Sequence, residues 1–109
     1  MKFFQDMYVS EAVASHTDEL IAKIKQNSVV KGLYLIVLAE NSENLLEIIA
    51  SREIVKPMYS KRELWIVGLA GGRKDALQLV EHMIGQMYEQ TGTFDIRTYF
   101  QIEEDVRWK

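Results

Sequence analysis

The stretch LWIVGLAGGRKDAL, residues 64–77, joins an apolar run to two glycines and then to a segment with the apolar spacing of a helix. The run at 64–70 carries no charged or strongly polar side chain, which is typical of a strand buried on both faces. Beyond the glycines, apolar residues recur every three or four positions as far as Tyr88. The stretch therefore predicts a strand, a tight turn and a helix in succession.

A second stretch, 31 residues earlier, has the same organisation. LYLIVLA at 33–39 is another apolar run, and NSENLLEII at 41–49 offers Asn41 or Ser42 as the cap of a following helix. The two stretches agree in the kind of residue at most positions when one is laid over the other. Two like units in one chain favour parallel strands, so we expect the strands at 33–39 and 64–70 to lie side by side and point the same way.

The remaining segments complete the expected order of elements. Residues 10–27 carry apolar residues at helical spacing, with Asn27 as the expected stop, and Gly92 is the expected end of the helix that follows residue 72. Residues 94–102 alternate apolar and polar side chains, which predicts a strand near a sheet edge. The stretch 1–9 is expected to be an extended N-terminal arm, and 103–109 a loose tail in which Trp108 can dock.

Together these elements predict one α/β domain spanning residues 1–109. Its order would be α-β-α-β-α-β, with a three-stranded, mainly parallel sheet packed with three main helices. A sheet this narrow leaves its edges and some apolar helix surface uncovered. We therefore expect a homodimer or another form of self-association, or else a protein partner.

Composition excludes several classes of function. The 109 residues include 13 basic and 16 acidic side chains, for a net charge of −3, which argues against nucleic acid or an anionic membrane as partner. The absence of cysteine excludes disulfides and thiolate chemistry and suits a reducing compartment. Gln5, Asp6 and Glu11 interrupt the apolar N-terminal run, so no secretory signal is expected. No stretch reaches the length of a membrane span, so we expect a cytoplasmic protein with no membrane partner.

The strongest candidate site is the turn formed by Gly71, Gly72, Arg73 and Lys74. Free amides at a helix start, glycines that allow close approach, and two cations could together bind an anion. The spacing matches neither G-x-x-x-x-G-K-[ST] nor G-x-G-x-x-G, so a plain strand-to-helix turn is the preferred interpretation. If the two strands are parallel, Asn41 would lie near this turn, at the edge of the sheet where such folds bind ligands.

Other candidates are weaker. His16 and His82 have no second ligand at a metal-binding spacing, so no metal and no cofactor is expected. A basic group surrounds an aromatic side chain in the irregular connection 52–63, a composition that single-stranded nucleic acid can use. Nearby glutamates and the net negative charge of the protein favour a solvated loop there instead. The residues of this group are Lys56, Tyr59, Lys61 and Arg62.

Three segments, NLLEII at 44–49, VGLAGGRKDAL at 67–77 and TGTFDIRTYF at 91–100, resemble a family of small, uncharacterised bacterial proteins of nearly this length. The resemblance implies no catalytic residue. Two hypotheses follow. The first is a non-enzymatic cytoplasmic module that acts through self-association or a protein partner. The second is a small anion- or nucleotide-binding protein, or an enzyme, that uses residues 71–74 with help from Asn41.

Overall fold

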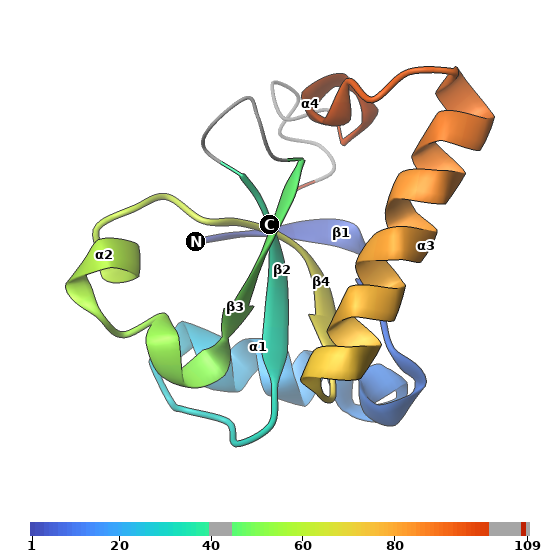
Figure 1. Ribbon diagram of the computed structural model, residues 1–109. Helices are drawn as coiled ribbons and strands as arrows, with labels where there is room; N and C mark the ends of the chain where they lie inside the picture. Colours follow the sequence, from blue (N-terminus) through green and yellow to red (C-terminus); the bar gives the residue numbers. More distant parts are fainter. Residues whose placement is uncertain (40–44, 101–107, 109) are drawn as a thin grey trace.

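The computed structural model describes residues 1–39, 45–100 and 108 (Figure 1). Four strands, two short 3-10 turns and four helices follow one another within these residues. In chain order they are β1 (Lys2–Val9), η1 (Glu11–His16), α1 (Thr17–Lys25), β2 (Tyr34–Leu38), β3 (Leu46–Ala50), η2 (Ser51–Glu53), α2 (Pro57–Ser60), β4 (Trp65–Ala70), α3 (Arg73–Thr91) and α4 (Ile96–Tyr99).

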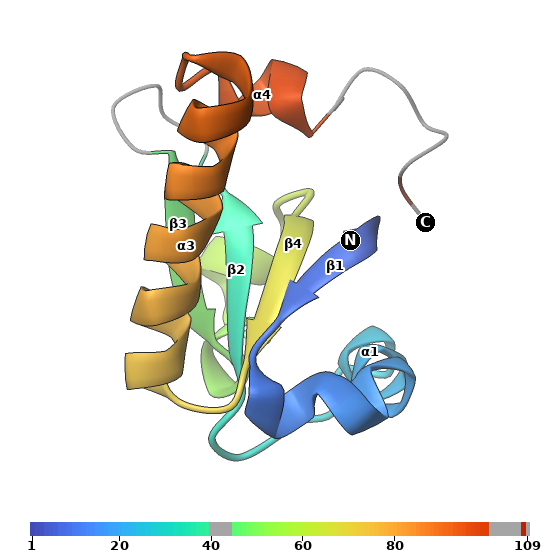
Figure 2. The same ribbon diagram turned by 90° about the vertical axis from the view of Figure 1, so that its right-hand side faces the viewer.

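The four strands form one mixed sheet in the order β1-β4-β2-β3. β1 runs parallel to β4, whereas β2 runs antiparallel to both of its neighbours, β4 and β3. Helix α3 covers one face of the sheet and α1 lies on the other side, so the domain has three layers (Figure 2). Within the described ranges no helix is long and apolar enough to cross a lipid bilayer.

The apolar runs are buried on both faces of the sheet, as the sequence predicts. In β2, Leu35 and Val37 pack with the core cluster that includes Ile24 of α1. Ile36 and Leu38 point the other way, into the cluster that includes Met83 of α3. Since both faces of β2 are covered, a continuous apolar sequence is what this strand requires.

The prediction of a three-stranded, mainly parallel sheet is wrong. Tyr34 pairs with Ala70 and Val37 with Ile66, so β2 and β4 are neighbours but run in opposite directions. The cause is the segment 41–49, which was expected to be a helix that returns the chain to a parallel strand. Where the structure describes it, this segment is β3, which turns back along β2 as a hairpin; residues 41–44 lie outside the described residues.

The helical interpretation of 41–49 failed because β3, like β2, has apolar residues on both faces. Ile48 packs on the α3 side and Ile49 on the α1 side. A strand of this kind does not show the alternation with period two that marks a half-buried strand, and its apolar residues can imitate helical spacing. The β-branched pair Ile48-Ile49 was the local signal for a strand.

The two ends of the chain also differ from expectation. Residues 2–9, expected to be an arm, form β1 and pair with β4. The strand predicted at 94–102 is wrong within its described part: α4 forms instead, because the Asp95 side chain caps it by accepting hydrogen bonds from the amide and the hydroxyl of Thr98. Trp108 is buried, so it does dock as expected.

The other helical predictions are confirmed. The helix expected at 10–27 is present as η1 followed by α1, and Asn27 beyond its end has φ 60°. α3 begins directly after Gly72 and ends at Gly92, whose φ of 72° is the left-handed conformation that glycine adopts easily.

Gly71 is the glycine whose replacement tests this packing. A Cβ built at Gly71 would lie 2.8 Å from the Cβ of Ala12 in η1, whereas one at Gly85, inside α3, would meet nothing within 4 Å. Gly71→Ala should therefore lower the free energy of unfolding by about 1–3 kcal/mol through overpacking. Gly85→Ala should raise it by about 0.5–1 kcal/mol because alanine favours the helix. Urea denaturation checks both; equal effects would contradict the close contact at Gly71.

Candidate functional site

Of the predicted turn, Gly71 and Gly72 lie between β4 and α3, and Arg73 and Lys74 are the first two residues of α3. The amide of Gly71 donates a hydrogen bond to the Ser10 hydroxyl at 3.0 Å, so this amide is engaged within the protein. Gly72 is the N-cap of α3, with φ 148°, a backbone conformation that residues other than glycine rarely adopt. Both glycines thus have a structural reason to be present, which is the plain-turn interpretation of this sequence.

The expected convergence of two strand ends at this turn is wrong. Because β2 is antiparallel to β4, the two strands end at opposite ends of the sheet. Leu38, the last residue of β2, is therefore far from Ala70 and from the turn that follows Ala70. Asn41, which was expected to assist the turn, lies outside the described residues. Arg73 and Lys74 are exposed and make no ion pair within the part of the chain that the structure describes. An anion site at Gly71–Lys74 stays a prediction.

A hollow of about 300 Å³ lies beside the start of α3. Two of its lining residues, Glu11 and Asp75, are carboxylates, so their charge opposes binding of a phosphate there. His82 also lines it, yet no group of histidine, aspartate and glutamate within the described ranges is arranged to hold a metal ion.

The basic group of the connection 52–63 is largely paired with carboxylates. Lys56 contacts Glu53 at 2.6 Å, and this hydrogen bond lowers the pKa of Glu53. Arg62 forms an ion pair with Glu47 at 3.3 Å and lies over the ring of Tyr59. Burial and the nearby Glu47 raise the pKa of Tyr59. These contacts favour the interpretation of this segment as structural surface.

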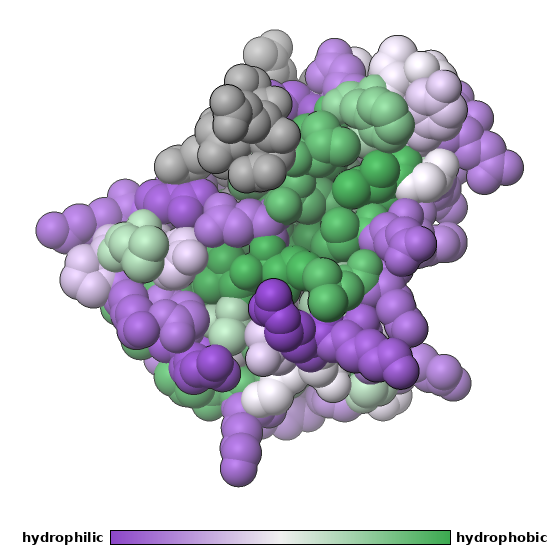
Figure 3. Space-filling view, viewed as in Figure 1, coloured by the Kyte–Doolittle hydropathy of each residue, from purple (hydrophilic) through white to green (hydrophobic). Residues whose placement is uncertain are grey.

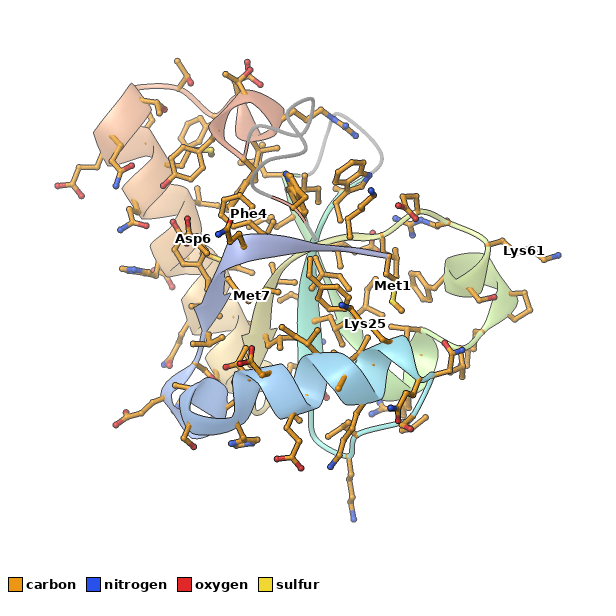
Figure 4. All side chains as sticks on the ribbon, turned by 180° about the vertical axis from the view of Figure 1, so that it is seen from behind. Met1, Phe4, Asp6, Met7, Lys25 and Lys61 are labelled. Carbon is orange, nitrogen blue, oxygen red and sulfur yellow. The ribbon has the colours of Figure 1, made fainter. Side chains whose placement is uncertain are left out.

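The two edges of the sheet differ in how they are covered. At the β1 edge, Trp108 forms a bridge with Phe4, and its indole packs on the rings of Phe4 and Trp65. The Trp108 Nε1–H also donates to the carbonyl of Phe100 at 3.0 Å. Figure 4 shows this edge from behind, with β1 running across it above α1. Trp108 therefore contributes to covering β1.

β3 forms the opposite edge, and its register with β2 shows which backbone groups face outward. The amide of Ala39 donates to the carbonyl of Leu45, and that of Ser51 to the carbonyl of Leu33. In an antiparallel ladder hydrogen-bonded pairs alternate with non-bonded pairs, so 45, 47, 49 and 51 direct their backbone groups toward β2. The N–H and C=O groups of Leu46, Ile48 and Ala50 point away from the sheet.

Beside this edge, which pairs with no further strand among the described residues, one flank of α3 is apolar. Ala76, Met83 and Met87 of α3 are buried, yet Leu77 and Tyr88 remain 51% and 52% exposed. At 100° per residue, Leu77, Val80, Ile84 and Tyr88 share one flank. Phe94, 50% exposed, stacks on Tyr88 with ring centroids 4.8 Å apart. This flank therefore offers large apolar side chains, two of them aromatic, to a partner.

The opposite flank of α3 is already in use by the protein. The Tyr8 hydroxyl of β1 donates to Gln86 and lies 3.2 Å from the Tyr99 hydroxyl, which in turn donates to Gln90. Burial raises the pKa of Tyr8 above that of an ordinary tyrosine. α3 is thus bound to β1 and α4 on one side, while its apolar flank faces the β3 edge.

We call the surface formed by this edge and this flank the β3–α3 face. Figure 3 shows hydrophobic residues gathered between β3, at the centre of the view, and α3 on its right. Its members are Leu46, Ile48, Leu77, Val80, Ile84, Tyr88 and Phe94.

The sequence predicted that some sheet edge and apolar helix surface stay uncovered, but it did not locate the β3–α3 face because 41–49 was assigned to a helix. One signal was available. The apolar positions of α3 include both 76, 83, 87 and 77, 84, 88, two adjacent stripes that together are wider than the apolar face of an ordinary surface helix.

Comparisons with protein-family models, with curated proteins and with solved structures gave no match. The bacterial origin that the sequence resemblance implies has no support from them. Function is therefore inferred from the geometry of this chain alone.

Hydrogen exchange tests the open edge directly. In dilute solution the amides of Leu46, Ile48 and Ala50 should exchange at least about tenfold faster than those of Glu47 and Ile49, since only the latter are bonded to β2. NMR-detected exchange measures each amide. Uniform protection along β3 in dilute, monomeric protein would contradict an open edge.

Proposed function

We propose that the protein is a non-enzymatic module that works by self-association, and that the β3–α3 face is the surface through which it associates. The observation that carries this proposal is the juxtaposition of an open strand edge with an exposed apolar helix flank. Either feature alone is common on monomers; side by side they offer both backbone hydrogen bonds and apolar area to a partner.

The energetics favour covering this surface. Each Å² of apolar area removed from water contributes about 25 cal/mol, and side chains as large as Leu77, Tyr88 and Phe94 each expose about half of their area. Aromatic residues are also enriched among the groups that dominate interface energies. An open edge with apolar neighbours exposes the chain to uncontrolled aggregation, which a defined partner would prevent.

The anion-binding hypothesis has less support. At residues 71–74 the first amide is bound to Ser10, and the neighbouring hollow is lined by Glu11 and Asp75. A second hollow beside Gly71 has Lys31 and His16 among its lining residues, but Arg73 and Lys74 do not line it. We therefore place the function at the β3–α3 face.

Sedimentation of the wild-type protein over a concentration series tests the proposal. The sedimentation coefficient should rise with concentration. The double variant Leu77→Lys, Tyr88→Lys should weaken association at least about tenfold, because it places two charges in an interface that must lose water. Both positions are exposed in the single chain, so the fold should be retained.

The matched control is Val29→Lys with Met58→Lys, two exposed apolar residues that lie elsewhere, at 54% and 64% exposure. It should associate as the wild type does. A wild-type protein that stays monomeric up to its solubility limit, or an equal loss in both double variants, would overturn the proposal.

A further inference from the structure

We infer that the partner at the β3–α3 face is a second copy of this chain, related to the first by a twofold axis, with β3 paired antiparallel to β3 and the axis at Ile48. This inference rests on the proposed function, since it specifies the partner and the register at the same face.

The backbone of β3 is complementary to itself in this register. Leu46, Ile48 and Ala50 direct their N–H and C=O groups outward, as the ladder with β2 requires. With the axis at Ile48, that residue lies opposite its own copy, and Leu46 lies opposite Ala50 of the second copy. The three pairs form about six hydrogen bonds and use every outward backbone group of the strand.

The side chains on the α3 side then meet across the axis. A twofold axis perpendicular to the sheet keeps both α3 helices on the same face, where Leu46 and Ile48 also lie. The apolar flanks of the two helices face each other over the joined strands, so that Leu77 and Tyr88 lose the exposure they have in the single chain. The result is one continuous sheet, in which the two α3 helices cover the centre where the two β3 strands pair.

The charges of α3 are complementary in the same arrangement. Arg73 and Lys74 stand at the N-terminus of the helix, where the macrodipole disfavours cations, and its last turn has no basic residue. The twofold axis makes the two helices antiparallel. Arg73, which lies on the apolar flank, then approaches the C-terminal end of the other helix, whose partial negative charge it offsets.

An extended segment of a different protein could use the same backbone groups, but it would not explain the charge pattern of α3. A twofold pairing also covers the β3 edges of the two copies at once and closes the assembly. A head-to-tail contact between copies that does not close would extend into fibres. The structure therefore favours a closed dimer over addition of a foreign strand.

Single cysteines test the register cleanly because the chain has no cysteine of its own. In the proposed dimer the Cα atoms of position 48 are about 5.5 Å apart, within the range of a disulfide. Ile48→Cys should therefore give a disulfide-linked dimer on mild oxidation. Leu46→Cys alone should not, since its copies are about 14 Å apart, whereas Leu46→Cys with Ala50→Cys should cross-link again.

Hydrogen exchange of the unmodified protein provides a second measurement in case a variant fails to fold. At concentrations where the wild type sediments as a dimer, the amides of Leu46, Ile48 and Ala50 should become protected, and dilution should remove this protection. In the variant Leu77→Lys, Tyr88→Lys the protection should be absent at the same concentration.

The outcomes separate this inference from the proposed function. Dimers that form without a cross-link at position 48 and without protection of the three amides would overturn the β3 pairing but leave self-association in place. Protection that appears only when another protein is added would overturn the inference in favour of a foreign strand. A strictly monomeric wild type would overturn both.

Discussion

β2 is the element on which the rest of the structure depends. It is the only described strand that runs against the others, it pairs with a neighbour on each side, and its residues Leu35 to Val37 are fully buried. A strand so placed must be apolar on both faces and must find hydrogen-bond partners along both edges. β4 provides one set of partners and the hairpin strand β3 the other. Because β1 pairs with β4, β3 is left at the edge of the described sheet.

The position of β3 at the edge links the fold to the proposed function. The chain covers its other edge with Trp108, which packs on Phe4 of β1, and the flank of α3 nearer β1 is tied by Tyr8 and Gln86. Nothing comparable among the described residues covers β3 or the flank that carries Leu77 and Tyr88. Within the described residues the β1 edge is thus covered and the β3 edge is not. The exposed apolar and aromatic side chains lie beside the uncovered β3 edge.

The parts of this fold that the sequence predicts are those governed by local chemistry. A charge-free run such as 64–70 indicates a doubly buried strand, Gly72 and Gly92 mark the ends of α3, and Asn27 follows the end of α1. Strand direction could not be predicted, because it depended on whether 41–49 returns as a helix or as a hairpin. Ile48 and Ile49 are buried on opposite faces, which removes the alternation that separates these cases.

For the candidate site, too, local features could be predicted from the sequence and contacts between distant segments could not. Gly71 and Gly72 were identified as a turn, but Ser10, which accepts a hydrogen bond from the amide of Gly71, lies 61 positions away, so this contact could not be foreseen. The β3–α3 face required knowledge of which strand is at the edge, which no local pattern contains. The narrow predicted sheet indicated in general that apolar helix surface stays uncovered, and the width of the apolar arc of α3, from Ala76 and Met83 to Leu77 and Tyr88, was the local signal for where.

The central claim is that two copies join through β3 in one register, and nuclear Overhauser contacts between labelled and unlabelled copies test it most directly. Where hydrogen-bonded pairs are centred on Ile48, Glu47 of one copy and Ile49 of the other form a non-bonded pair with Cα atoms about 4.5 Å apart. The account predicts an intermolecular contact between the Hα protons of these two residues. A dimer whose intermolecular contacts exclude β3 would contradict it.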